Sequence, residues 1–267
     1  SAVNCDDGNE CTDDGCESAV GCVTSNNNIP CDDDDECSFE DSCKVGKCLG
    51  WRYSDGKVDG SIKISKNLGG FGSALSPYDS FGRAAAGIGD INGDGIPDIA
   101  VGAPNDDDGG NGVGAIWIAF LNDEGKVIES QKIGSEAGAF QGALFVGDAF
   151  GTSLAALGDL NGDGIGDIAV GARGDDGGAN AGGAVWILFM NADGTVKIEL
   201  EITTGQAGMS EQLFANDGFG SSLAAVGDLD GDGVTELAVG LPGRDGALDI
   251  NEGAVWILYL KKNGAVK

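Results

Sequence analysis

Short apolar stretches alternate with glycine- and aspartate-rich stretches along most of the chain. Between residues 81 and 134 the apolar stretches lie at roughly 84–89, 97–103, 113–121 and 126–133, each bounded by clusters of Gly, Asn and Asp. Apolar segments of this length between turn-forming residues are typical of β-strands and are short for helices. The sequence therefore predicts an all-β protein.

This strand pattern repeats at a step of 69 residues. The dipeptide Phe-Gly stands at 81–82, 150–151 and 219–220, and the dipeptide Val-Gly stands at 101–102, 170–171 and 239–240. A unit of this length is one supersecondary element, which can bury its apolar face only against a neighbouring unit. We expect three stacked units over 81–267.

An acidic nonapeptide lies between the first and second predicted strands of each unit. Its first copy, 90–98, reads Asp-Ile-Asn-Gly-Asp-Gly-Ile-Pro-Asp. A Ca²⁺ loop needs side-chain oxygens, here at positions 1, 3, 5 and 9, and a backbone carbonyl, here at position 7. It also needs a glycine, here at position 6, to make the sharp turn. An EF-hand is excluded because position 12 is not Glu and a strand follows.

A solvated acidic turn is the alternative, but three copies at one fixed step favour calcium, about one ion for each loop. The predicted ligands, with the position-7 residue acting through its carbonyl, are Asp90, Asn92, Asp94, Ile96 and Asp98; Asp159, Asn161, Asp163, Ile165 and Asp167; and Asp228, Asp230, Asp232, Val234 and Glu236.

The order Phe-Gly, Gly-Asp-x-Asn-Gly-Asp-Gly, Val-Gly-Ala-Pro resembles the FG-GAP repeat over about 75–267. That repeat is the blade of integrin α-subunit β-propellers and of many bacterial surface proteins. The resemblance implies three four-stranded blades whose acidic loops bind calcium. The chain departs from it by placing Glu236 where the last Asp belongs. It also has three repeats where an integrin head has seven, so we expect an incomplete propeller.

A small cysteine-rich domain is predicted at 1–50. It holds all eight cysteines: Cys5, Cys11, Cys16, Cys22, Cys31, Cys37, Cys43 and Cys48. An even number of cysteines in a short segment indicates a disulfide framework and an oxidising compartment. Zinc is disfavoured because the chain has no His and no Cys-x2-Cys pair. The pattern Cys-Asp-Asp-Gly-Asn-x-Cys-Thr-Asp-Asp at 5–14 resembles cysteine-rich modules of bacterial secreted proteins. Pairing within each half is preferred, and its connectivity stays open.

Residues 51–80 are predicted to be a linker that carries a detached blade strand. Laid on the repeat, 55–80 matches the last strand and exit loop of a blade, while the chain ends at Lys267 as the same strand begins again. The apolar residues of the detached strand are Val58, Ile62 and Ile64. We expect this strand to be donated to another copy, head to tail, giving a filament in preference to a ring. A fragment of a longer propeller is the alternative.

The net charge of −29 and the pI near 4.1 argue against nucleic-acid and anionic-membrane partners, and no stretch of 18 apolar residues is present. Ser1 does not begin a signal peptide, which agrees with a processed chain. Without His, a Ser-His-Asp or Cys-His site cannot form, and the best placed carboxylates are better explained as calcium ligands. Trp117, Trp186 and Trp256 are expected in the core.

The sequence therefore favours a non-catalytic, calcium-stabilised structural or adhesion protein that is secreted or lies at the cell surface and assembles with itself. A carbohydrate- or protein-binding propeller module is the second hypothesis, and a secreted hydrolase is the third. A cell-surface protein or a glycan is the further candidate partner. The tripeptide Arg173-Gly174-Asp175, which many integrins bind, is not repeated in the other units, so we expect no role for it.

Overall fold

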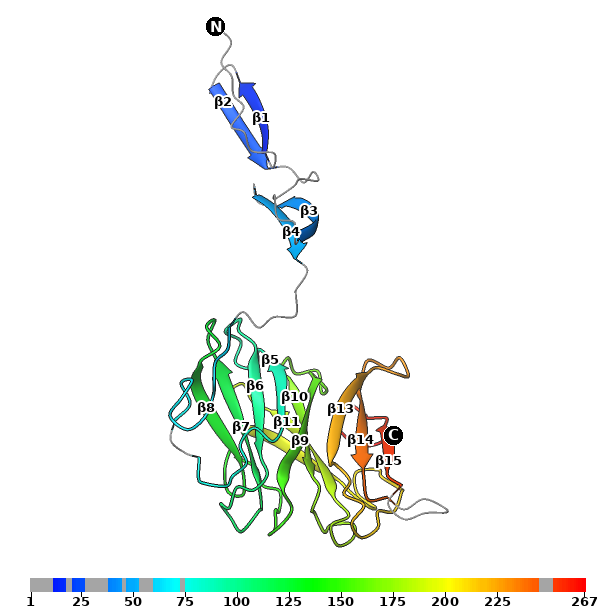
Figure 1. The fold of residues 1–267 in the computed structure, drawn as a ribbon. Helices are drawn as coiled ribbons and strands as arrows, with labels where there is room; N and C mark the ends of the chain where they lie inside the picture. Colours follow the sequence, from blue (N-terminus) through cyan, green and yellow to red (C-terminus); the bar gives the residue numbers. More distant parts are fainter. Residues whose placement is uncertain are drawn as a thin grey trace. The chain divides into compact units, whose positions relative to one another are not determined.

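The computed structural model of the chain describes residues 60–72, 75–244 and 252–267 in full and, before them, the backbone of four strands. The chain forms two compact units, Ser1–Ser61 and Ile62–Lys267. Every regular element in the described parts is a β-strand (Figure 1). No helix long and apolar enough to cross a membrane occurs among the described residues.

The N-terminal unit contains two antiparallel hairpins. Their strands are β1 (Thr12–Glu17) with β2 (Gly21–Asn26), and β3 (Ser38–Lys44) with β4 (Lys47–Arg52). The register places Cys16 opposite Cys22 and Cys43 opposite Cys48. Opposed residues of an antiparallel pair have Cα atoms about 4.5–5.5 Å apart, which a disulfide can span. Disulfide pairing within each half stays a prediction, and the other four cysteines lie outside the described residues.

The second unit consists of three antiparallel sheets, one for each sequence repeat, which we call blades 1, 2 and 3 (Figure 1). Blade 1 comprises β5 (Ala85–Gly89), β6 (Asp98–Ala103), β7 (Ala115–Leu121) and β8 (Val127–Gly134). Blade 2 comprises β9 (Phe150–Gly158), β10 (Asp167–Ala172), β11 (Ala184–Met190) and β12 (Val196–Ile202). Blade 3 comprises β13 (Ser222–Gly227), β14 (Glu236–Leu241) and β15 (Ala254–Leu258).

The predicted strands of the first repeat end within two residues of β5 to β8, so the strand pattern is confirmed. Strands pair in chain order within each blade, and blade 2 lies between the other two in an open array (Figure 1). The all-β class and the incomplete set of three blades are therefore confirmed. In blade 3 the predicted fourth strand is represented by a single bridge, between Leu260 and Val266.

The third strand of each blade carries the apolar residues that pack against the next blade. In blade 1, Ile116, Ile118 and Phe120 are buried in one cluster with residues of β10 and β11. Val185, Ile187 and Phe189 repeat this packing between blades 2 and 3. The equivalent residues of blade 3 are Val255, Ile257 and Tyr259, which are 68%, 42% and 41% exposed. Blade 3 therefore presents, uncovered, a face that the other blades bury.

Two glycines of the repeat allow neighbouring blades to approach closely. A Cβ atom on Gly102 would lie 2.0 Å from the carbonyl oxygen of Gly151, and one on Gly171 would lie 2.0 Å from that of Gly220. Each contact joins the Val-Gly dipeptide of one blade to the Phe-Gly dipeptide of the next. The spacing of the two dipeptides thus reflects backbone contact between blades, where no side chain fits.

Residues 62–72 lie beside blade 1, in the place that the end of each fourth strand takes beside the following blade. The Gly69 carbonyl accepts the N–H of Val127 at 2.8 Å, as the Gly138 carbonyl accepts that of Val196. Ile64 packs on the outer apolar cluster of blade 1, and Ile62 is 44% exposed. The segment thus takes the predicted exit-loop position, while Val58 lies outside the described residues.

Candidate metal centres

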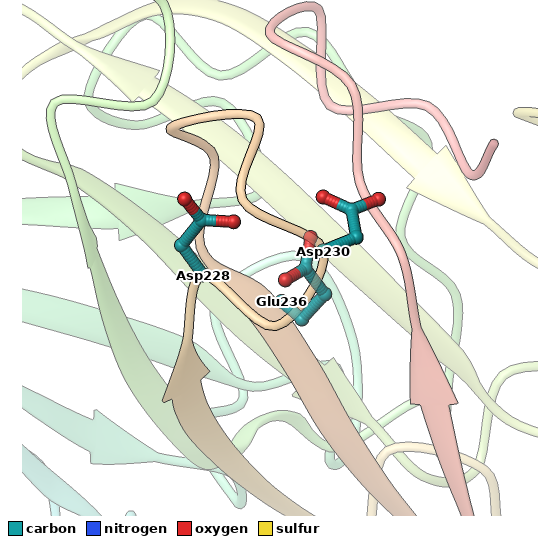
Figure 2. Close-up of side chains that lie close together, drawn as sticks. All are labelled: Asp228, Asp230 and Glu236. Carbon is teal, nitrogen blue, oxygen red and sulfur yellow. The ribbon is translucent and has the colours of Figure 1, made fainter.

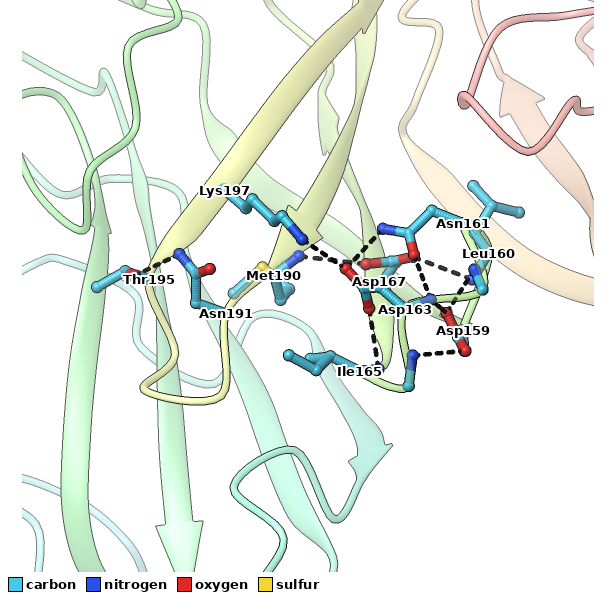
Figure 3. Close-up of polar contacts among 12 residues, drawn as sticks. Asp159, Leu160, Asn161, Asp163, Ile165, Asp167, Met190, Asn191, Thr195 and Lys197 are labelled. Atoms are coloured by element: carbon cyan, nitrogen blue, oxygen red, sulfur yellow. Dashed lines mark hydrogen bonds and ion pairs between the residues drawn. The ribbon is translucent and has the colours of Figure 1, made fainter.

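Each acidic nonapeptide forms the loop between the first and second strands of its blade. In blade 2 the Asp159 carboxylate accepts three backbone N–H groups: those of Gly162 and Asp163 on Oδ1, at 2.7 and 2.9 Å, and that of Gly164 on Oδ2, at 2.8 Å (Figure 3). Gly162 and Gly164 have φ angles of 83° and 91°, which favour glycine. The same three bonds recur in the other loops. The first carboxylate therefore organises the loop.

The ninth residue closes the loop from inside the blade. Asp167 Oδ2 accepts the N–H of Leu160 at 3.0 Å, and its Oδ1 accepts that of Met190 on β11 at 3.2 Å (Figure 3). Burial raises the pKa of Asp167 to about 6, although these N–H groups act in the opposite direction. Asp98 makes the two corresponding bonds in blade 1, and burial raises its pKa as well. A nearby cation would favour the charged form of both carboxylates.

Positions 3 and 5 of the loop face each other through their polar ends. In blade 2, Asn161 Oδ1 accepts the N–H of Asp163 at 2.8 Å, and Asn161 Nδ2 donates to Asp163 Oδ2 at 3.1 Å (Figure 3). Both side chains thus lie within the turn that Asp159 organises. The loop gathers three of the four predicted side-chain positions close to one another, with Asp167 beneath them.

Two lysines that the sequence analysis missed reach the loops from the start of the fourth-strand segment. Lys197 Nζ lies 3.0 Å from Asp163 Oδ2 (Figure 3). Lys267 Nζ lies 2.6 Å from Asp230 Oδ2 and 2.8 Å from Asp232 Oδ2. Both follow the valine that begins that segment, but the equivalent residue of blade 1 is Ile128, so the repeat does not mark them. Ammonium groups at both loops show that the loops attract positive charge.

The loop of blade 3 has the arrangement of oxygens that best fits a cation. Asp228, Asp230 and Glu236 each offer an oxygen within 4.8 Å of the others (Figure 2). Glu236 is 0% exposed, and its Oε2 accepts the N–H of Leu229 at 2.6 Å. Its Oε1 accepts no hydrogen bond within the described structure and lies 3.8 Å from Lys267 Nζ. A buried carboxylate oxygen without a hydrogen-bond donor fits a cation that three hard oxygen ligands would hold.

The side-chain ligands predicted from the sequence thus lie in three equivalent loops, and blade 3 alone brings three acidic side chains together in this way among the described residues. In the first two loops, position 3 is an asparagine. The carbonyls of Ile96, Ile165 and Val234 stay predicted ligands.

Other candidate residues lie in the core. Trp117 and Trp186 are buried and Trp256 packs against an apolar cluster, so they do not form an exposed row for stacking sugars. Asp175 of the Arg-Gly-Asp tripeptide is buried as well, which removes its carboxylate from the surface.

The second unit is an array of three blades, two with four strands and one with three, at a period of 69 residues and with an acidic loop between the first two strands of each. This arrangement defines a propeller-blade repeat protein. The FG-GAP repeat model matches residues 81–118, 150–188 and 219–258, which cover the three blades. The chain therefore contains three FG-GAP repeats, in agreement with the resemblance seen in the sequence.

Integrin α-subunits are similar over the same region. The chain is 31% identical to integrin alpha-PS5 of Drosophila melanogaster over 175 residues, 65% of this chain and 16% of that protein. It is 34% identical to human integrin alpha-7 over 163 residues, 60% of this chain and 12% of that protein. The chain thus spans about a sixth or less of the length of these relatives.

Proposed function

We propose that the chain is a calcium-stabilised, non-catalytic adhesion module that acts outside the cell. Its three repeats are of the kind found in integrin α-subunits, which supports an adhesion role at a cell surface. The eight cysteines of residues 1–50 agree with an oxidising, extracellular location. The observation that carries the calcium assignment is the buried, unbonded Oε1 of Glu236 beside Asp228 and Asp230.

Bound calcium would supply positive charge at the three loops and link each loop's ends. The first carboxylate of each loop holds the turn by accepting backbone N–H groups; these residues are Asp90, Asp159 and Asp228. The ninth carboxylate fixes the base of the loop to the blade core; these residues are Asp98, Asp167 and Glu236. The smaller Mg²⁺ demands octahedral geometry and keeps several waters, so flexible loops with carboxylate, amide and carbonyl ligands favour calcium.

Calcium titration calorimetry tests this proposal. We expect three bound ions per wild-type chain, with dissociation constants on the order of 10⁻⁴–10⁻³ M, as in extracellular modules. Glu236→Gln replaces the charged oxygen by an amide and should weaken the third site at least about tenfold, a loss of 1.4 kcal/mol. Glu211→Gln, at an exposed position outside the loops, should leave all three sites unchanged. Wild-type protein that takes up no calcium would overturn the metal assignment.

We further propose that a second copy of the chain covers the exposed face of blade 3. This face carries Val255, Ile257 and Tyr259, and the equivalent residues of blades 1 and 2 are covered by the following blade. A blade-like partner therefore matches this surface. Strand β15 hydrogen-bonds to β14, and no other described strand pairs with it. Residues 55–66 of the second copy would add beside β15, with Val58, Ile62 and Ile64 contributing roughly 1.5–3 kcal/mol for each side chain fully buried.

Deleting residues 55–66 should abolish self-association, which sedimentation velocity measures over a concentration series. Ile257→Lys should have the same effect, because it places a charge on the blade 3 face without removing any segment. Ile128→Lys changes an equally apolar but separate exposed position of β8 and should leave association intact. A wild-type chain that stays monomeric at high concentration, or a deletion variant that still assembles, would refute strand donation.

A further inference from the structure

Blade 3 contains a cavity at the position where blades 1 and 2 receive the following blade. Gly240 of this cavity belongs to the Val-Gly dipeptide of the repeat, and Gly253 is the glycine that precedes the third strand of each blade. The cavity has a volume of about 680 Å³, and we call it the blade 3 cavity. Its lining includes Ser222, Gly240, Leu241, Glu252, Gly253 and Val255.

In blades 1 and 2 the equivalent position holds the Phe-Gly dipeptide of the following blade. Each of these phenylalanines forms a parallel bridge to the glycine that precedes the third strand. The N–H of Phe150 donates to the Val113 carbonyl at 3.0 Å, and the N–H of Phe219 donates to the Gly182 carbonyl at 2.9 Å. Both phenylalanines are fully buried. The two covered blades thus bind a Phe-Gly dipeptide in the same way.

The blade 3 cavity carries the groups that make these contacts. The carbonyl of Glu252 stands where the other blades accept the phenylalanine N–H, and it accepts no backbone hydrogen bond from the described residues. Ser222 is exposed and stands 69 residues after Ser153, whose Oγ donates to the Gly220 carbonyl at 2.6 Å. Blade 3 is therefore equipped to receive a further Phe-Gly dipeptide.

Blade 1, at the other end of the array, carries a Phe-Gly dipeptide that no described blade covers (Figure 1). The ring centres of Phe81 and Phe71 are 5.0 Å apart, close to the 5.3 Å of the equivalent pair in blade 2. Gly82 has a φ angle of 91°, against 89° for Gly151. The N–H of Phe81 donates to no described backbone carbonyl, and the space beside Gly82 is open. This dipeptide thus has the conformation of a docked one.

We propose that the Phe81-Gly82 dipeptide of a second copy docks in the blade 3 cavity, so that blade 1 of one chain packs on blade 3 of another as blade 2 packs on blade 1. The Phe81 N–H would donate to the Glu252 carbonyl, and Ser222 Oγ would donate to the Gly82 carbonyl. Residues 62–66 of the second copy would then lie beside β15. This inference rests on the proposed self-association and names the surface of the second copy that takes part in it.

Gly240→Ala fills part of the blade 3 cavity and tests the docking from one side. Within one chain, the three atoms nearest to the added methyl all belong to Ser222, whose exposed side chain can rotate. In the docked pair the methyl would clash with the Gly82 carbonyl, as a methyl on Gly171 would clash with that of Gly220. We therefore expect an unchanged melting temperature for the dilute chain and at least about tenfold weaker association in sedimentation velocity.

Ala85→Lys tests the docking from blade 1. Ala85 is exposed on β5, whereas its equivalent in blade 2, Leu154, is buried in the cluster between blades 1 and 2. A lysine at this position should leave the fold intact and weaken association at least about tenfold, because it places a charge in the docked interface. Gly87→Ala on the same face of β5 is the matched control and should leave association unchanged, because Ala156 packs against that cluster at the equivalent position.

The docked arrangement also contains one unfavourable contact. Lys63 takes the place of Lys132 in the repeat, and Arg244 takes the place of Asp106, with which Lys132 pairs at 2.7 Å. Docking would therefore bring two positive side chains together. Lys63→Glu should tighten association about tenfold, since it replaces this repulsion by an attraction. Association that is unchanged or weaker in this variant would contradict the docked register.

Mixing Ala85→Lys with Gly240→Ala separates this proposal from self-association in general. Each variant keeps one working surface, so each alone should be monomeric at a concentration where the wild type assembles. The mixture should form a one-to-one dimer that grows no further. If either variant alone assembles like wild type while Ile257→Lys does not, docking of blade 1 is overturned and a second copy on blade 3 still stands. A wild-type chain that stays monomeric overturns both.

Discussion

Removing calcium is expected to lower the melting temperature of the chain by roughly 10–30 °C. About 10 mM calcium is roughly 10 to 100 times the expected dissociation constants, which stabilises the folded state by about 1.4–2.7 kcal/mol per site, so three independent loops contribute about 4–8 kcal/mol. For a domain of this size, each kcal/mol corresponds to roughly 2–4 °C. The physical reason is that each loop gathers several carboxylates, which repel one another once the cation is removed.

Scanning calorimetry in about 10 mM calcium and then in excess chelator measures this difference. Asp159→Asn keeps an oxygen that can accept backbone N–H bonds but removes one negative charge from the second loop. It also replaces the oxygen that accepts the Gly164 N–H by an amide group that cannot accept it. It should therefore reduce the calcium-dependent increase by about a third and lower the melting temperature in chelator slightly. Exposed Asp123→Asn, in the turn between β7 and β8, is the matched control. Melting curves that coincide in calcium and in chelator would contradict a stabilising role for the metal.

The sequence alone was sufficient for the features that repeat. A step of 69 residues placed the strands, the three acidic loops and the apolar third strands, because equivalent residues in stacked units have equivalent surroundings. The Phe-Gly and Val-Gly dipeptides were visible as well. The sequence did not show why these dipeptides recur. Only the structure shows that Gly102 lies against Gly151, and Gly171 against Gly220.

The features that distinguish one blade from another could not be predicted in this way. Lys197 and Ile128 occupy equivalent positions, and only the folded loop shows that the lysine reaches Asp163. Glu236 was recognised as a substitution, but its unbonded oxygen depends on the extra methylene and on how β14 is buried. Each of these depends on contacts between segments far apart in the sequence.

Gly171→Ala is expected to destabilise the chain by about 3 kcal/mol, the upper end of the usual cost of overpacking. The added methyl would lie 2.0 Å from the Gly220 carbonyl oxygen and 2.3 Å from Ser153 Oγ. Ser153 can change its rotamer, but the Gly220 carbonyl belongs to the backbone, so blades 2 and 3 must separate locally. Phe219 and Leu237, which are fully buried in the cluster between these blades, would lose packing as a result.

Urea unfolding followed by tryptophan fluorescence measures this cost, with calcium saturating so that the loops contribute equally in every variant. Gly102→Ala makes the same contact between blades 1 and 2 and should cost a similar amount. Gly87→Ala is the matched control, because this strand glycine of β5 has open space around its Cβ position. It should change the free energy of unfolding by no more than about 0.5 kcal/mol, or raise it by restricting the unfolded chain. If Gly171→Ala cost no more than Gly87→Ala, close backbone contact between blades 2 and 3 would not be the reason for the glycine at position 171.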